Sequence, residues 1–139
     1  MLTFLFLKTP TCDQINALIC LYQEAKWWSA ETDNRDLIKA IITGSHCFCV
    51  ATVDQKIIGM GRAISDGVSD AYIQDVAVLK AFRHKGIATQ IITRLIEKLE
   101  VDGIGWIGLI AENNTADFYH RFGFTPMENS APMLRLRKL

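Results

Sequence analysis

An apolar strand, a short basic loop and an amphipathic helix meet in the stretch Val78-Leu-Lys-Ala-Phe-Arg-His-Lys-Gly-Ile-Ala-Thr89. Strand-like residues end near Val78, and apolar residues at helical spacing begin after Gly86. The first turn of a helix has backbone N–H groups without partners and a partial positive charge, which suits a phosphate group. Because Gly86 and Ala88 lack bulk, a pyrophosphate can approach the backbone closely.

The charge of this loop is local. The whole chain has 15 basic and 15 acidic residues, so its formal net charge is zero. A neutral chain has no general attraction to nucleic acid or to an anionic membrane, and we expect neither as a partner. The basic residues before Gly86 therefore predict a small polyanion, although they would also suit an ordinary strand-to-helix turn with a solvated basic rim.

This stretch resembles the acetyl-CoA signature of the GCN5-related N-acetyltransferases (GNAT family). The matching pattern is Arg83-x-x-Gly86-x-Ala88, preceded by Val76-x-Val78 and Phe82. Lys80 stands where the family usually has proline, and His84 where it often has glycine or asparagine. The resemblance implies that the strand backbone pairs with the pantetheine arm of acetyl-CoA and that the loop amides hold its pyrophosphate. The cofactor-binding residues would be Val76, Ala77, Val78, Arg83, His84, Lys85, Gly86, Ile87, Ala88 and Thr89.

A second motif, Ala116-Asp-Phe-Tyr-His-Arg-Phe-Gly-Phe124, is similar to the family's downstream signature, a helix with Phe-Tyr followed by Gly-Phe. The resemblance implies that Phe118 and Tyr119 contact the cofactor. Many members also have an asparagine seven residues before this tyrosine; here that position is Glu112, and Asn113 is expected to take the role.

The pattern of elements predicts an α/β (α+β) mixed sheet with helices on both faces, in the order β-α-α-β-β-β-α-β-α-β. We expect one N-acetyltransferase domain over residues 1–139. The expected strands are Leu2–Leu7, His46–Val53, Lys56–Ser65, Asp70–Leu79, Ile104–Ile110 and Met133–Leu136. The expected helices run from a capping box at Thr11 to about Lys26, from Asp33 or Asn34 to Gly44, from Gly86 to about Glu100, and from Thr115 to Phe122. The buried face of the first helix is expected to comprise Ile15, Leu18, Ile19 and Tyr22, and that of the second Leu37, Ile38, Ile41 and Ile42. We expect hairpin turns at Asp54-Gln55 and Asp66-Gly67.

Two side chains are candidates for proton transfer. Asp75 interrupts an apolar strand that we expect to be covered on both faces, and a carboxylate there is costly unless paired or useful. It is the candidate general base, by similarity to plant serotonin N-acetyltransferases, or else a structural carboxylate held by Arg62 or by turn amides. Tyr119 is the candidate proton donor to the leaving thiolate, or else an aromatic plug. The resemblance also implies that a backbone N–H near Val76 polarises the thioester carbonyl.

Three residues are candidates for the acceptor site. Trp27 and Trp28 follow the first expected helix, in a region that forms one wall of the acceptor site in the family, and adjacent tryptophans can stack an aromatic or cationic amine. Core filling or a homodimer contact would equally account for them. Arg62 is a candidate for binding an acceptor carboxylate, or a solvent-exposed strand residue.

The sequence thus predicts direct acetyl transfer from acetyl-CoA to a small primary amine, with aromatic amines among the candidates. The alternatives are a non-catalytic acetyl-CoA sensor and an acetyltransferase acting on protein N-termini or lysines. We expect a cytoplasmic chain, because no leader or membrane span is recognisable. The four cysteines lack metal-ligand spacing, so we expect no metal site and interpret them as small buried hydrophobes.

Overall fold

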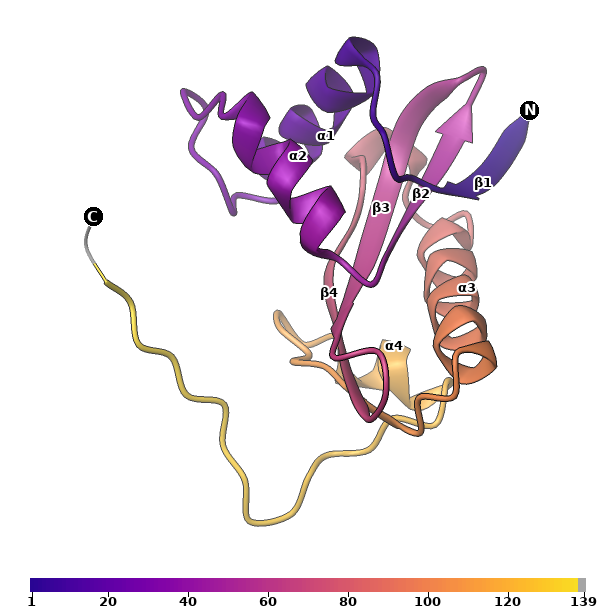
Figure 1. Ribbon diagram of the computed structural model, residues 1–139, viewed down its shortest axis with the longest axis vertical. Coiled ribbons are helices and arrows are strands. Elements are labelled where there is room, and N and C mark those ends of the chain that lie inside the picture. Colours follow the sequence, from indigo (N-terminus) through magenta and orange to yellow (C-terminus); the bar gives the residue numbers. More distant parts are fainter. Residues whose placement is uncertain (138–139) are drawn as a thin grey trace. The chain divides into compact units, whose positions relative to one another are not determined.

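The computed structural model describes residues 1–137, which fall into two units. The first unit is Met1–Gly108, and the second begins at Leu109. The first unit contains a sheet with the strand order β1-β2-β3-β4-β5 (Figure 1). Its strands are β1 (Leu2–Phe6), β2 (Cys47–Val53), β3 (Lys56–Ser65), β4 (Asp70–Val78) and β5 (Trp106–Gly108). The first four pair antiparallel and β5 pairs parallel to β4, so the mixed sheet that the sequence predicts is confirmed.

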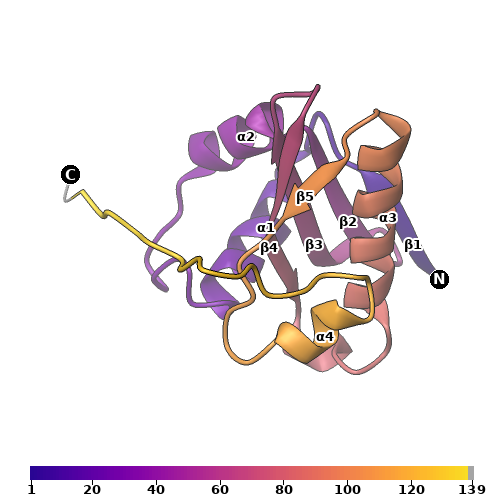
Figure 2. The same ribbon diagram turned by 90° about the horizontal axis from the view of Figure 1, so that it is seen from below.

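Two helices, α1 (Cys12–Glu24) and α2 (Arg35–Gly44), cover one face of this sheet (Figure 2). The predicted capping box forms: the Thr11 hydroxyl accepts from the Gln14 amide, and the Gln14 side chain accepts from the Thr11 amide. The face of α1 that was expected to be buried lies in the core with Phe48, Val50 and Met60 of the sheet. The buried side of α2 is narrower than expected, since Leu37 is 41% exposed.

The opposite face of the sheet carries α3 (Ile87–Val101). Its Ile91 and Leu95 are fully buried and lie against the glycines of β3. A Cβ atom at Gly61 would lie 2.7 Å from Ile91 Cγ2 and 3.2 Å from Leu95 Cδ1. The absence of a side chain at this position therefore lets the helix approach the sheet closely.

A β-bulge interrupts the pairing of β3 with β4. Arg62 pairs with Gln74 and Met60 pairs with Ala77, so Asp75 and Val76 together face the single residue Gly61. Asp75 has a left-handed φ of 57°. The extra residue changes the alternation of the strand: Asp75 contacts Tyr22 of α1, whereas Val76 packs with Ile91 on the α3 face. The bulge thereby puts a carboxylate on the α1 side.

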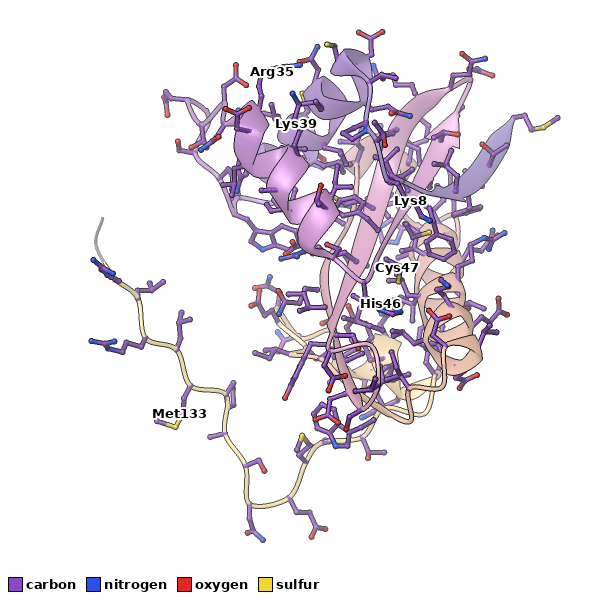
Figure 3. The ribbon with its side chains drawn as sticks, viewed as in Figure 1. Lys8, Arg35, Lys39, His46, Cys47 and Met133 are labelled. Carbon is purple, nitrogen blue, oxygen red and sulfur yellow. The ribbon has the colours of Figure 1, made fainter. Side chains whose placement is uncertain are left out.

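The second unit contains one short helix among its described residues, α4 (Ala116–His120). Aromatic rings cluster around it, with Phe118 in edge contact with Phe122 and Tyr119 in edge contact with Phe124. The predicted strand Met133–Leu136 is wrong, because these residues are extended but pair with no strand, and Met133 is 92% exposed (Figure 3). Residues 109–137 contain no strand, so this unit supplies no hydrogen-bond partners for Met133–Leu136.

Two further expectations are corrected. β4 is not covered on both faces: its first half alternates, with Ala71 and Ile73 buried but Tyr72 46% exposed. The strand expected at Ile104–Ile110 is shortened to β5, and glycines at positions 105 and 108 weaken strand formation there. Among residues 1–137, no helix is long and apolar enough to cross a membrane.

Candidate active site

The loop before α3 forms a cradle of backbone amides. Gly86 caps the helix with a left-handed φ of 76°, after His84 with a φ of 64°. The Gln90 amide makes the first helical hydrogen bond, to the Gly86 carbonyl at 3.2 Å. The amides of Ile87, Ala88 and Thr89 therefore have no acceptor within the helix. A Cβ atom at Gly86 would meet no atom within 4 Å, so the space above the cradle is open.

The basic residues of the loop differ in their contacts. Arg83 stabilises the turn, because its Nε donates a 2.9 Å hydrogen bond to the Val78 carbonyl. Its guanidinium also lies 3.9 Å from the Glu24 carboxylate of α1, which accepts from the Lys80 amide at 2.6 Å. His84 and Lys85 are exposed, and the Lys85 ammonium carries positive charge beside the cradle. The 3₁₀ helix η1 (Lys80–Phe82) lies between β4 and Arg83.

The edge of β4 next to the cradle is open within the first unit. β5 pairs only with Asp70, Ala71 and Tyr72, so β4 has no β5 partner from Ile73 onward. The Leu79 amide donates to the Ile58 carbonyl of β3 at 2.9 Å. Because successive residues of a strand direct their backbone groups to opposite neighbours, those of Val76 and Val78 face the open edge. A cofactor arm that pairs like a strand would fit there.

Asp75 is the centre of a hydrogen-bond network on the α1 face. Its Oδ2 accepts from the Tyr22 hydroxyl at 2.7 Å and from Arg62 Nε at 2.6 Å. Arg62 also donates to the Ser45 hydroxyl at 3.3 Å. Within residues 1–137, no hydrogen bond reaches Asp75 Oδ1. Burial and the neighbouring Asp75 charge raise the pKa of the Tyr22 phenol, so Tyr22 acts as a donor.

Arg62 therefore occupies a different environment from the one expected of an acceptor-binding or exposed residue. Its side chain is 15% exposed and forms an ion pair with Asp75. This is the contact that the structural alternative for Asp75 expected; it engages Oδ2 and leaves Oδ1 without a hydrogen bond among residues 1–137.

The two tryptophans flank the same network. Trp28 stacks on the Tyr22 ring with a centroid separation of 5.0 Å, and Trp27 meets that ring edge-on at 5.9 Å. Trp28 is half-buried and packs on the core, whereas Trp27 is 42% exposed. Of the pair, Trp27 offers the surface that a ligand can reach.

Tyr119, Phe118 and Asn113 belong to the second unit. The Tyr119 ring is half-buried against Phe118 and Phe124. Burial, with a smaller effect from the Glu112 charge, raises the pKa of its phenol, so the hydroxyl stays protonated at neutral pH. Asn113 adopts a left-handed φ of 55° in the turn that precedes α4. Its contact with the cofactor stays a prediction.

Sequence reasoning missed Tyr22. Its helical spacing predicted only a core position on α1, and 53 residues separate it from Asp75. Among the described residues there is no group of three or more His, Cys, Asp or Glu side chains that could hold a metal ion. Cys47 and Cys49 are buried as expected, but Cys12 and Cys20 lie exposed on the outer side of α1, so their predicted burial is wrong.

Residues 44–126 match the family model of the acetyltransferase (GNAT) domain. The chain belongs to the GNAT family. GCN5-related N-acetyltransferase 1, chloroplastic, from Arabidopsis thaliana is 34% identical over 94 residues, which cover 65% of this chain and 48% of that protein. Serotonin N-acetyltransferase 2, chloroplastic, from Oryza sativa is 33% identical over 67 residues, covering 48% of this chain and 34% of that protein.

Histone acetyltransferase TAP1 from Glycine max is 37% identical over 70 residues, covering 50% of this chain and 28% of that protein. These GNAT matches thus span less than half the length of the relatives. The fold is also that of a probable acetyltransferase, SA2161 from meticillin-resistant Staphylococcus aureus, with a TM-score of 0.81 and 20% identity. That likeness covers 99% of this chain and 100% of the other.

Proposed function

We propose that this GNAT chain is an N-acetyltransferase that transfers the acetyl group of acetyl-CoA directly to a small primary amine. The observation that carries the proposal is the combination of an open amide cradle at Gly86–Thr89 with an open edge of β4 beside it. The cradle matches a pyrophosphate, and the edge matches an extended amide-containing arm.

The chain's residues fit acetyl-CoA at both places. The amides of Ile87, Ala88 and Thr89 would hold the pyrophosphate, with His84 exposed beside it and Lys85 adding positive charge. Backbone groups of Val76 and Val78 would pair with the pantetheine arm. When bound, acetyl-CoA supplies an acetyl thioester. The Val76 amide, directed toward the open edge, would polarise the acetyl carbonyl.

Two side chains would move protons. Asp75 takes a proton from the amine through Oδ1, which accepts no hydrogen bond within residues 1–137. Tyr119 gives a proton to the leaving sulfur, a role supported by its protonated phenol. Both assignments come from the resemblance and from the chemistry of these groups.

The acceptor side of the proposed site contains an exposed indole and a carboxylate. Exposed Trp27 and the Asp75 carboxylate together favour an amine with an apolar or aromatic body. The serotonin acetyltransferase relative supports this class, whereas the histone acetyltransferase relative favours a peptide amine as the second candidate. A cytoplasmic location stays a prediction, and the names of two relatives place those proteins in the chloroplast.

The test combines binding and turnover. Acetyl-CoA at millimolar concentration should raise the thermal midpoint of the protein, because a ligand of the native state stabilises it. A panel of aromatic amines, polyamines and lysine peptides should then show CoA thiol release with at least one member. Binding without release from any acceptor would favour the sensor alternative, and absence of binding would refute the proposed function.

A further inference from the structure

We propose that Tyr22 is a positioning residue for the acetyl transfer: together with Arg62 it holds Asp75 Oδ2, so that Oδ1 is directed to the acceptor amine. This inference rests on the proposed N-acetyltransferase function. It adds a residue that neither the motifs nor the family resemblance identifies.

The first argument is the geometry of the carboxylate. Both donors use one oxygen, Tyr22 at 2.7 Å and Arg62 at 2.6 Å, and they come from different elements, α1 and β3. Two charge-assisted hydrogen bonds to Oδ2 fix the rotation of the carboxylate about its Cβ–Cγ bond. Oδ1 has no hydrogen bond from residues 1–137, and the Asp75 side chain is 20% exposed. One oxygen is thus fully engaged while the other is available.

The backbone supports the same arrangement. Asp75 occupies the bulge of β4 with a φ of 57°, a region that non-glycine residues seldom adopt. Such conformations persist where surrounding contacts hold them, and they gather at functional sites. The bulge turns the carboxylate toward α1, where Tyr22 meets it.

Tyr22 is itself held in place. Its ring is 3% exposed and stacked on Trp28, and its carbonyl accepts hydrogen bonds from the amides of Trp27 and Trp28. The phenol therefore has little freedom to turn away from Asp75. Because burial raises the pKa of Tyr22, the hydroxyl is a permanent donor at physiological pH and does not act as a base itself.

This arrangement serves the proton balance of the reaction. The amine nitrogen must lose a proton as it bonds to the acetyl carbon, and that proton passes to Asp75 Oδ1 and then to solvent. The sulfur leaves with the electron pair of the C–S bond and takes a proton from Tyr119, the proton donor of the proposed function. A carboxylate that rotates freely would present Oδ1 to the amine only part of the time.

The variant Tyr22→Phe tests the role, since it keeps the ring and removes only the hydroxyl. We expect kcat to fall roughly tenfold, the effect of one hydrogen bond to a charged group, while the acetyl-CoA thermal shift is kept. Tyr72→Phe is the matched control, because Tyr72 is exposed and its hydroxyl makes no hydrogen bond within residues 1–137. Wild-type kcat in Tyr22→Phe would overturn the proposal.

A double-mutant cycle separates positioning from packing. If Tyr22 acts through Asp75, Tyr22→Phe should cause no further loss in an Asp75→Asn background. Losses that multiply would show that the hydroxyl acts elsewhere and would also overturn the inference.

A measurement without substrate distinguishes failure of this inference from failure of the proposed function. In protein with ¹³Cζ-labelled tyrosine at pH 7, the Tyr22 resonance should differ from that of Tyr72 because of its carboxylate partner. Asp75→Asn should move the Tyr22 resonance toward that of Tyr72. An unmoved resonance would mean that the hydrogen bond is absent in solution, whatever the enzyme acetylates.

Discussion

Gly61 of β3 lies against Ile91 of α3 so closely that a Cβ atom at Gly61 would come within 2.7 Å of Ile91 Cγ2. Gly61 is also the single residue opposite the β4 bulge, and its Cβ would lie 3.3 Å from Val76 Cγ2. One position thus governs both the distance of the helix from the sheet and the packing of the bulge.

Gly61→Ala should therefore destabilise the fold by about 1–3 kcal/mol, the usual cost of overpacking a core. Chemical unfolding measures the loss. Gly44→Ala is the control, because a Cβ there meets nothing within 4 Å and Gly44 ends α2, where alanine costs little. Equal stability of the two variants would contradict the close packing.

The cradle predicts that Gly86→Glu abolishes the thermal stabilisation by acetyl-CoA, because a carboxylate would point into the phosphate site. The control is Gly67→Glu in the β3–β4 connection. Gly67 has a similar left-handed φ of 82° and equally open surroundings, so both variants carry the same backbone strain and charge. A wild-type response in Gly86→Glu would contradict the placement of the pyrophosphate.

Tyr119→Phe should lower kcat without weakening acetyl-CoA binding, by about 10²-fold at most, the low end of the range for a positioned proton donor. The ring contacts with Phe118 and Phe124 would be kept. Steady-state kinetics and isothermal calorimetry on the same preparation measure the two effects. If affinity falls and kcat does not, Tyr119 binds the cofactor and donates no proton.

The four thiols should fall into two classes. Burial raises the pKa of Cys47 to about 11 and of Cys49 to about 12, whereas Cys12 and Cys20 are exposed. At pH 8 the buried Cys47 has only about one thiolate in a thousand, so labelling by a disulfide reagent should stop at two thiols. Denaturant should make Cys47 and Cys49 reactive as well. Rapid labelling of all four thiols in the native protein would contradict the burial of these two cysteines.

A surface cluster predicts part of the acid sensitivity. Lys98 and His46, which directly precedes β2 and is labelled in Figure 3, both form hydrogen bonds with Asp102 and lower the pKa of its carboxyl. A lowered folded-state pKa stabilises the protein above the unfolded-state value, and this contribution disappears as the pH falls through the folded value. Asp102→Asn should thus lower stability at neutral pH and flatten its acid limb. If stability falls equally steeply with acid in the wild type and in Asp102→Asn, the proposed contribution of Asp102 is contradicted.

The sequence predicted the strand-to-helix junction at Gly86, both hairpins and the buried face of α1, because glycine, turn residues and apolar spacing determine these features locally. Asp54 and Gln55, for example, both adopt the left-handed conformation of a tight hairpin turn. The predicted strand at Met133–Leu136 failed for the opposite reason. Apolar residues alone do not make a strand, since its backbone needs a partner that local sequence does not reveal.

In the candidate site, too, the features fixed by neighbouring residues were predicted and those fixed by tertiary contacts were not. The motif at Arg83-x-x-Gly86 placed the cradle, because its geometry depends on neighbouring residues. The sequence offered an Arg62–Asp75 contact only as one of several alternatives, and it could not show that Tyr22 meets the same carboxylate oxygen. Those contacts depend on a bulge and on the packing of α1 over β3, which are tertiary features.

The β4 bulge also changes what insertions and deletions in this strand would do. Substituting Asp75 alters one side chain, whereas deleting it would leave Val76 alone opposite Gly61 and keep the pairs Arg62–Gln74 and Met60–Ala77, so that the strand regains plain alternation. Val76 would stay on the α3 face, and the backbone groups of Val76 and Val78 would keep their direction toward the open edge, but the carboxylate that meets Tyr22 on the α1 face would be lost. A relative that lacks one residue here would therefore keep the open edge of β4 and lose the carboxylate on the α1 face, even if every remaining residue were identical.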